Sequence, residues 1–181
     1  MLYTFEGRQP TIGKATYVSE LAQVIGDVVI GDNCYIGHSA ILRGDYGHIV
    51  IGDGTAVEES VIIQAPPDHY NRIGKRVTLG HGAIVHGNFI GDEAVIGMGA
   101  VLSIFSEIGD GSIIAEGSQV KWNQVIPPHV VAAGNPATVK REVNASDREI
   151  WNYGKQLYVD LAKRYLESDL EPVAIDQCRV K

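Results

Sequence analysis

The side chains best suited to chemistry lie in the middle of the chain. His81 and His86 are five residues apart, Gln64 precedes them, and Glu58 and Glu59 are adjacent carboxylates. Imidazole and, less often, carboxamide groups bind zinc and related metals, whereas carboxylates accept protons. Two histidines at this spacing are surface residues more often than ligands, so the spacing alone favours the simpler interpretation. How these groups lie in space depends on the elements that carry them.

Those elements follow from a six-residue period that runs through most of the chain. Aliphatic residues occupy the repeating positions, and glycine often follows them. They are Ile12, Val18, Val24, Ile30, Ile36, Leu42, Ile51, Val57, Ile63, Ile73, Leu79, Val85, Ile90, Ile96, Leu102, Ile108, Ile114 and Val120. The pattern predicts an all-β solenoid, a parallel β-helix of hexapeptide repeats with three repeats per coil. Its left-handed sense is expected from resemblance to hexapeptide proteins.

Stacked coils convert equal sequence offsets into columns, because strands of adjacent coils lie about 4.8 Å apart. Two columns near corners contain the polar residues. The first is Arg43, Gln64, His86 and Ser103, and the second is His38, Glu59, His81 and Met98. An amide would thus lie beside an imidazole, with a second imidazole one corner away, and such a group could form a metal site.

The period is interrupted in three places. The spacing is nine residues between positions 42 and 51, ten between 63 and 73, and five between 85 and 90. A loop extruded from a solenoid leaves the stacking intact and puts its residues on the outer surface. We therefore expect functional residues at these interruptions.

Composition limits the remaining classes. The 181 residues predict one domain, with 15 basic and 22 acidic side chains and a net charge of −7, which argues against nucleic acid and anionic membrane partners. No signal-like N-terminus or long apolar stretch is apparent, so we expect a cytoplasmic protein. Cys34 and Cys178 lie far apart without a CxxC motif, which predicts free, inert thiols.

The repeat weakens after Val120, and Pro127 and Pro128 remove two backbone donors where a further coil would need them. We expect the β-helix to occupy residues 1–137, a linker and C-terminal helix residues 138–168, and a loose tail residues 169–181. Ser146 and Glu149 have the spacing of a capping box that opens this helix. Its predicted apolar stripe is Ile150, Tyr153, Leu157, Tyr158, Leu161, Tyr165 and Leu166.

Several of these segments resemble gamma-class carbonic anhydrases and their close homologues. The resemblance rests on Arg43-Gly44-Asp45, on LGHGAIVHG at residues 79–87, on IGMGA at 96–100, on AGNPA at 133–137 and on the helix around Tyr158. It covers about residues 8–167. The histidine pair and the Arg-x-Asp pair are fairly specific, whereas the repeat and the Gly-Asn-Pro exit are shared with hexapeptide acyltransferases.

The resemblance implies a homotrimer with one zinc, iron or cobalt ion at each subunit interface. His86 would be a ligand from one subunit and His81 a ligand from the neighbour. The family's third histidine follows a stretch commonly written Asn-Ile-Gln-Asp, and here the corresponding residues 56–64 are AVEESVIIQ. Gln64 therefore replaces that histidine. Three outcomes stay open: Gln64 binds the metal, His69 from the following loop substitutes for it, or the site is empty.

The resemblance also assigns roles to the neighbouring residues. Glu58 replaces a glutamine that hydrogen-bonds the metal-bound hydroxide, so it could accept the proton or raise the pKa of the bound water. Glu59 keeps the charge of the family's aspartate and is expected to pair with Arg43 or another cation at the subunit contact. Arg43 and Asp45 resemble the intersubunit ion pair that helps to bind bicarbonate, and Tyr158 a tyrosine placed over the site.

We therefore expect a carbonic anhydrase (carbonate dehydratase) type lyase, in which metal-bound hydroxide converts carbon dioxide to bicarbonate at the subunit interface. Glu58 or His69 would carry the proton away. Two alternatives remain. One is a non-catalytic trimeric homologue with a degenerate metal site, favoured by Gln64. The other is a coenzyme A dependent hexapeptide acyltransferase, which the central position of the histidines and the short loops disfavour.

Overall fold

The computed structural model describes residues 1–86, 89–168 and 170–178. The strands are β1 (Leu2–Tyr3), β2 (Thr11–Ile12), β3 (Tyr17–Val18), β4 (Gln23–Ile30), β5 (Tyr35–Ile36), β6 (Ile41–Ile51), β7 (Ala56–Val57), β8 (Ile62–Gln64), β9 (Tyr70–Ile73), β10 (Thr78–Leu79), β11 (Ile84–Val85), β12 (Phe89–Ile90), β13 (Val95–Ile96), β14 (Val101–Leu102), β15 (Glu107–Ile108), β16 (Ile113–Ile114), β17 (Gln119–Val120), β18 (Val125–Ile126), β19 (Val130–Gly134) and β20 (Ala137–Glu142). The helices are α1 (Ala145–Glu167) and the 3-10 helix η1 (Ile175–Cys178).

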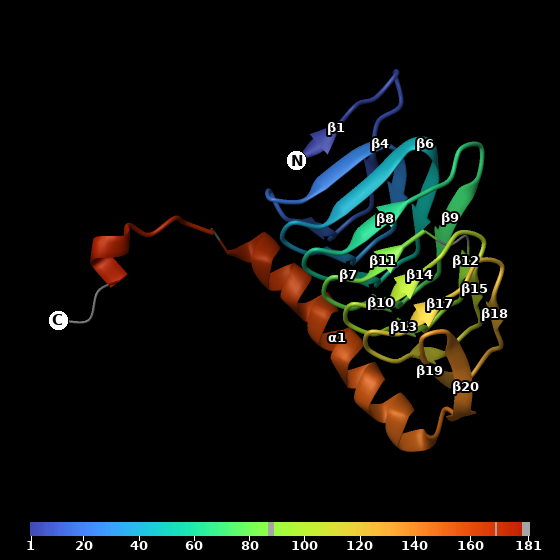
Figure 1. Cartoon of the computed structure of the whole chain (residues 1–181). Helices are drawn as coiled ribbons and strands as arrows, with labels where there is room; N and C mark the ends of the chain where they lie inside the picture. Colours follow the sequence, from blue (N-terminus) through green and yellow to red (C-terminus); the bar gives the residue numbers. More distant parts are fainter. Residues whose placement is uncertain (87–88, 169, 179–181) are drawn as a thin grey trace.

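The strands form a parallel β-solenoid of stacked coils, with α1 along its side (Figure 1). One face is the 8-stranded sheet in the order β20-β19-β16-β13-β10-β7-β5-β3, whose seven parallel strands correspond to about seven turns. The other two faces belong to one 12-stranded sheet, because β8 pairs with the beginning of β6 and β9 with its end. The predicted solenoid of hexapeptide repeats with a C-terminal helix is confirmed.

The aliphatic ladder fills the interior. The repeating residues from Val24 to Val120 are all buried, and the isoleucines and leucines among them are at most 1% exposed. Each such side chain contributes about 1.5–3 kcal/mol relative to an exposed one. Glycine after the ladder residue allows the close approach of the next coil: a Cβ on Gly80 would lie 2.8 Å from the Met98 nitrogen. Stability therefore comes from the ladder, which leaves the outward corner residues free for function.

Within the expected range 1–137, the solenoid continues through the segment where the repeat weakens. β18 pairs with β15, and β19 pairs with β16, both in parallel. Pro127 and Pro128 lie in the turn between β18 and β19, where they donate nothing to the ladder, and the Pro127 carbonyl accepts a hydrogen bond from Ser112 at 2.7 Å. The expectation that the two prolines prevent a further coil is wrong, because they occupy a corner.

The interruptions of the period also differ from expectation. The first is not an extruded loop, since residues 42–51 lie within the continuous strand β6, which bends across two faces of the solenoid. The second contains the turn before β9, as expected of a loop. The third includes residues 87 and 88, which lie outside the described residues.

The capping box of the helix α1 lies two residues before the predicted one. Asn144 is the N-cap residue: its side chain accepts a hydrogen bond from the Asp147 amide, and Asp147 accepts one from the Asn144 amide, each at 2.9 Å. This reciprocal pair satisfies two amides that the first helical turn leaves free. Ser146 and Glu149 are therefore not the capping pair, because the helix has already begun before Ser146.

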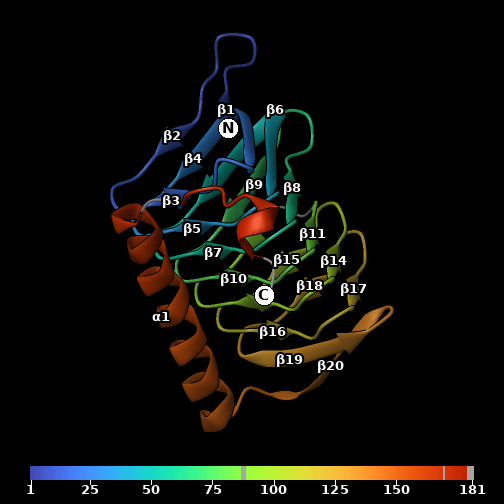
Figure 2. The same cartoon turned by 90° about the vertical axis from the view of Figure 1, so that its left-hand side faces the viewer.

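The helix packs along the 8-stranded sheet, beside β3, β5, β7 and β10 in Figure 2. Its buried residues are Lys155 and Ala162, and Tyr158, Leu161 and Tyr165 pack beside them against Tyr17, Tyr35 and Ala56. The predicted stripe is thus only half correct, since Ile150, Tyr153, Leu157 and Leu166 are exposed. Lys155 is buried at this contact in place of an apolar residue, because Glu93 of the solenoid provides an ion-pair partner for its ammonium group.

Lys155 holds the helix α1 against the solenoid. Its ammonium group donates to the Glu93 carbonyl at 2.6 Å and to the Glu93 carboxylate at 2.9 Å, and Arg76 pairs with the same carboxylate at 2.9 Å. Burial lowers the pKa of Lys155, and the Glu93 carboxylate opposes that shift. The contact determines where the residues one turn away on the helix meet the sheet.

The remaining features add little to the site. Cys34 is buried, Cys178 is exposed, and both are free, as predicted. Within the described ranges, no helix is long and apolar enough to span a bilayer.

Candidate functional site

The strand register produces the first predicted column. Arg43 in β6 is the direct partner of Gln64 in β8, and the pairing of Ile84 with Ile62 and of Val85 with Ile63 brings His86 beside Gln64 in the next coil. We call these three residues, Arg43, Gln64 and His86, the His86 corner. An amide and an imidazole from adjacent coils therefore share one edge of the solenoid, as the sequence predicts.

His86 has a partly apolar environment. It lines a pocket of about 350 Å³ together with Ile84, Leu102 and Trp122. Burial lowers the pKa of His86, and the nearby Arg43 cation lowers it further. The imidazole is therefore held in its neutral form near pH 7, which is the form that coordinates a metal.

The second column is also present, since the Ser60 amide bonds the His38 carbonyl, the Gly82 amide the Glu59 carbonyl and the Gly99 amide the His81 carbonyl. Within it, the ring of His81 lies between two carboxylates. Nδ1 is 2.8 Å from Glu59 Oε2, and Nε2 is 3.2 Å from Glu58 Oε2. We call Glu58, Glu59 and His81 the His81 corner.

Glu58 is the most buried acid of the group, with 6% of its surface exposed. Its Oε2 accepts a hydrogen bond of 3.0 Å from the His81 amide, and Tyr158 of α1 donates another to the carboxylate. Burial raises the pKa of Glu58, while His81 and Tyr158 oppose the shift. Burial and the Glu58 charge likewise raise the pKa of Tyr158, so its phenol stays protonated as a donor.

Glu59 has partners within the chain. The Tyr35 hydroxyl donates to Glu59 Oε1 at 2.6 Å, and His81 contacts Oε2. Partial burial opposes ionisation of Glu59, but the hydrogen bonds from Tyr35 and the backbone, together with His81, leave its pKa below the ordinary value. Within one chain Glu59 therefore pairs with His81, and its expected pairing with Arg43 or another cation at the subunit contact stays a prediction.

Arg43 and Asp45 also pair within one chain. Arg43 Nε lies 3.1 Å from Asp45 Oδ2, and both side chains are partly exposed. The two side chains thus lie close together within one chain, and their expected contact between subunits stays a prediction. A partly exposed pair of this kind contributes about 0–1 kcal/mol.

His69 lies in the loop before β9 and is exposed. Its ring packs edge-on against Phe105, with centroids 5.0 Å apart, and it lines a different pocket from His86, beside Tyr70 and Arg72. Its described contacts are those of a loop histidine that packs on an aromatic neighbour.

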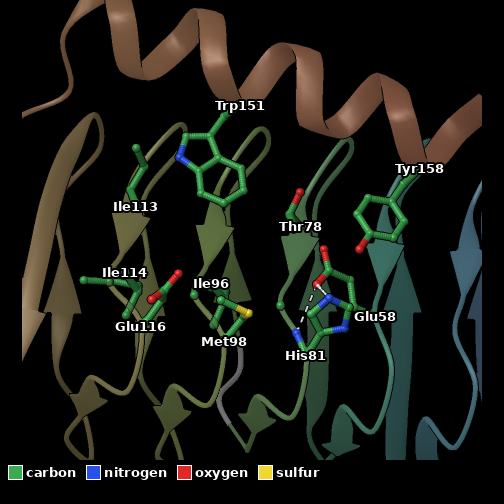
Figure 3. Close-up of a pocket in the computed structure, with 13 residues that line it drawn as sticks. Glu58, Thr78, His81, Ile96, Met98, Ile113, Ile114, Glu116, Trp151 and Tyr158 are labelled. Atoms are coloured by element: carbon green, nitrogen blue, oxygen red, sulfur yellow. Dashed lines mark hydrogen bonds and ion pairs between the residues drawn. The ribbon is translucent and has the colours of Figure 1, made fainter.

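A groove between α1 and the 8-stranded sheet was not predicted from the sequence. It has a volume of about 570 Å³ and includes Glu58, Thr78, Met98, Glu116, Trp151 and Tyr158 in its lining. Figure 3 shows Trp151 and Tyr158 pointing from the helix toward the sheet. The available signal was the spacing of Trp151, Lys155 and Tyr158, which places them on one helix face.

Within the described parts of one chain, no three His, Cys, Asp or Glu side chains converge as a metal site. His81 and His86 lie in different columns, and Gln64 accompanies only His86. The two corners are therefore separate within one chain.

Comparisons with known proteins agree with the repeat. The profile described as bacterial transferase hexapeptide (six repeats) matches residues 9–44, and the one described as hexapeptide repeat of succinyl-transferase matches residues 27–65 and 70–103. The solved structure of a hexapeptide transferase family protein from Anaplasma phagocytophilum superposes with a TM-score of 0.84 at 27% identity, covering 91% of this chain and 98% of that one.

Two curated relatives narrow the family. The carnitine operon protein CaiE of Escherichia coli K12 is 35% identical over 162 residues, covering 90% of this chain and 83% of CaiE. Gamma carbonic anhydrase 2 of Arabidopsis thaliana mitochondria is 33% identical over 162 residues, covering 86% of this chain and 58% of the plant protein. The chain belongs to the family of hexapeptide-repeat proteins that includes CaiE and gamma carbonic anhydrase.

Proposed function

We propose that the protein is a metal-dependent lyase of the gamma carbonic anhydrase type, which hydrates carbon dioxide reversibly at a site shared by two subunits of a homotrimer. His86 and Gln64 of one chain and His81 of the next would hold zinc, iron or cobalt. The observation that carries the proposal is the orientation of His81. Its Nδ1 contacts the carboxylate of Glu59, as when an acidic partner orients a metal-binding imidazole. Its Nε2 lies 3.2 Å from Glu58 Oε2 and would have to leave that carboxylate to bind a metal.

The donor groups fit such an ion. His86 is neutral near pH 7, and Gln64 in the adjacent coil offers a neutral carboxamide oxygen. An amide is a weaker donor for zinc than an imidazole, so we expect a lower affinity than three histidines would give. A bound metal would supply Lewis-acid activation of water near neutral pH.

An apolar face beside His86 supports assembly. Ile62 and Ile84 point outward from β8 and β11, and each is 41% exposed. Ile41 and Val101 continue the row in β6 and β14 and are partly buried. Such a row, next to a polar half-site, suits a contact between copies of the chain. A trimer would bring the His86 corner of one copy to the His81 corner of another.

The chain's own residues would manage the proton. Glu58 is buried with a raised pKa, so it can take a proton from the reacting water more readily than an exposed carboxylate. Tyr158 donates to the same carboxylate and fixes its orientation. Carbon dioxide is small and uncharged, so its binding would need few further contacts with the protein.

A second candidate is a non-catalytic trimeric homologue with a degenerate metal site. Both ring nitrogens of His81 already face carboxylates of the same chain, so the ring is satisfied without a metal. The replacement of the family's third histidine by Gln64 also favours a non-catalytic homologue. The third candidate function is a coenzyme A dependent acyltransferase. The carboxylates around His81 disfavour it, because they would repel the phosphates of coenzyme A.

The test is the metal content and carbon dioxide hydration of protein purified without a histidine tag. The proposal predicts close to one equivalent per chain and hydration that a chelator abolishes. His129→Ala is a matched control, because His129 lies in the corner between β18 and β19. An intact trimer that takes up neither zinc, iron nor cobalt would support the non-catalytic homologue instead.

A further inference from the structure

The groove beside α1 has the properties of a second ligand site. In Figure 3, Glu58 and Tyr158 lie at one end, Trp151, Ile113 and Glu116 at the other, and Thr78 and Met98 between them. This order follows the strands β7, β10, β13 and β16, which lie side by side in the sheet. The groove is formed by one chain, so it exists whether or not a metal binds between subunits.

An unsatisfied hydroxyl faces the groove. Thr78 is 3% exposed, and its Oγ1 has no hydrogen-bond partner among the described residues. Leu79 next to it points into the core, so the alternation of the strand directs Thr78 outward, toward α1. A buried hydroxyl without a partner costs free energy. The groove therefore offers a hydrogen bond that nothing in the described chain uses.

The charge in and around the groove is negative. Glu58 and Glu116 line it, Glu59 lies against His81, and among the lining residues neither lysine nor arginine occurs. His81 is the one group in the lining that could carry a positive charge, and it faces two of the three carboxylates. Lys155 on the same helix does not offset them, because its ammonium group is paired with Glu93.

The walls of the groove contain two aromatic rings and a polarisable thioether. The indole of Trp151 and the phenol of Tyr158 descend from α1, and the thioether of Met98 lies on the sheet side. Aromatic faces attract organic cations, tryptophan most strongly, and the attraction grows when water is excluded. Carboxylates provide the counter-charge that such a ligand needs.

We propose that this groove binds a small organic ammonium ion that carries a hydroxyl or similar polar group. The cationic head would lie against the aromatic rings with Glu58 as counter-ion, and the polar group would meet Thr78. This site goes beyond the proposed hydration activity and does not depend on it. The volume of about 570 Å³ exceeds the needs of a simple ammonium ion, so a longer ligand also fits.

The test uses three probes of nearly equal shape: choline, its neutral isostere 3,3-dimethylbutan-1-ol, and the anion 3,3-dimethylbutanoate. Binding is measured by calorimetry and by the fluorescence of Trp151 in a Trp122→Phe background, since the chain has two tryptophans. Protein is treated with a chelator first. We expect choline to bind with a dissociation constant of about 1 mM or below, the alcohol about ten-fold more weakly, and the anion not detectably.

Variants locate the ligand. Thr78→Val keeps the shape and removes the hydroxyl, and it should weaken choline binding about three- to ten-fold. Glu58→Gln should weaken it about ten-fold or more, and Trp151→Leu, followed by calorimetry, should do the same. Glu107→Gln is the matched control, because Glu107 is exposed on β15, in the other sheet, and should change nothing.

Several results would overturn the proposal: equal binding of choline and the alcohol, preferential binding of the anion, no binding of any probe, or a full-strength choline complex in both Thr78→Val and Glu58→Gln. His86→Ala separates this site from the metal site, since it should bind choline normally. Protein that binds choline but no metal would retain this inference and refute the proposed function, and the reverse result would do the opposite.

Discussion

The His86 corner and the His81 corner are produced by the same repeat, yet they differ in chemistry. At the His86 corner an imidazole lies beside an amide and a cation, in an apolar pocket that keeps it neutral. At the His81 corner an imidazole is held by two carboxylates, one of them buried. The first corner is suited to coordinate, and the second to orient a ligand and move a proton. Under the proposed function, the two corners would act together across a subunit contact.

Removing either histidine tests this division most severely. His81→Ala and His86→Ala should each abolish metal binding, with occupancy falling from about one equivalent to near zero. Both variants should remain folded, because the buried aliphatic ladder and not the corners stabilises the solenoid. Metal analysis with circular dichroism checks both statements. If one variant keeps full occupancy, that corner does not contribute a ligand.

Gln64→His sharpens the contrast, because it gives the His86 corner a second imidazole. Zinc affinity, measured by competition with a chelator, should rise about ten-fold or more. Hydration should rise as well if weak binding limits the native protein. Glu58→Gln combined with Gln64→His is the fairer test of rate, since the Glu58 charge can hold the pKa of bound water high. Unchanged affinity in both variants would mean that residue 64 does not face the metal.

Lys155→Ala should disturb only one of the two corners. It removes the buried partner of Glu93 that holds α1, and we expect the free energy of unfolding to fall by about 2 kcal/mol. The groove and Tyr158 would loosen, whereas His86 lies on another face. Denaturant titration measures the loss, and Lys163→Ala on the exposed side should cost less than about 0.5 kcal/mol. An equal cost for both variants would contradict this role of Lys155.

The smallest expected effect is on the N-terminal cap of α1, the helix that carries Tyr158 to the His81 corner. Arg141 and the Asn144 amide lower the pKa of Asp147 to about 2. Because the folded-state pKa lies below the ordinary value, the stabilisation is complete above about pH 5 and is lost as the pH falls toward 2. The difference in unfolding free energy between native protein and Asp147→Asn should therefore shrink over that range. A difference independent of pH would show that the carboxylate charge contributes nothing.

The sequence predicted what depends on local spacing. A six-residue period fixes which residues face inward, and equal offsets fix which residues lie above one another, so the ladder and the columns containing His81 and His86 followed directly. The same logic failed where one strand crosses a corner, as in β6, and at Pro127, because a proline is harmless in a turn and disruptive in a ladder.

What could not be predicted depends on packing between distant segments. Which face of α1 meets the sheet is decided by the pairing of Lys155 with Glu93, two residues 62 positions apart. That contact brings Trp151 into the groove that Thr78 also lines and exposes Ile150 and Leu157, whereas an apolar pattern alone assigns the leucine and isoleucine to the interior. The pairing of Glu59 with His81 and Tyr35 likewise required side-chain geometry.

Mixing two inactive variants tests the shared site most directly. His81→Ala chains retain His86, and His86→Ala chains retain His81, so a contact between the two kinds can restore one complete site. After unfolding and joint refolding in equal amounts, random assembly should recover about one quarter of the native metal content and hydration rate. Each variant refolded alone should recover none. If the mixture stays as inactive as its components while its trimers form normally, the site is not shared between chains and the account is wrong.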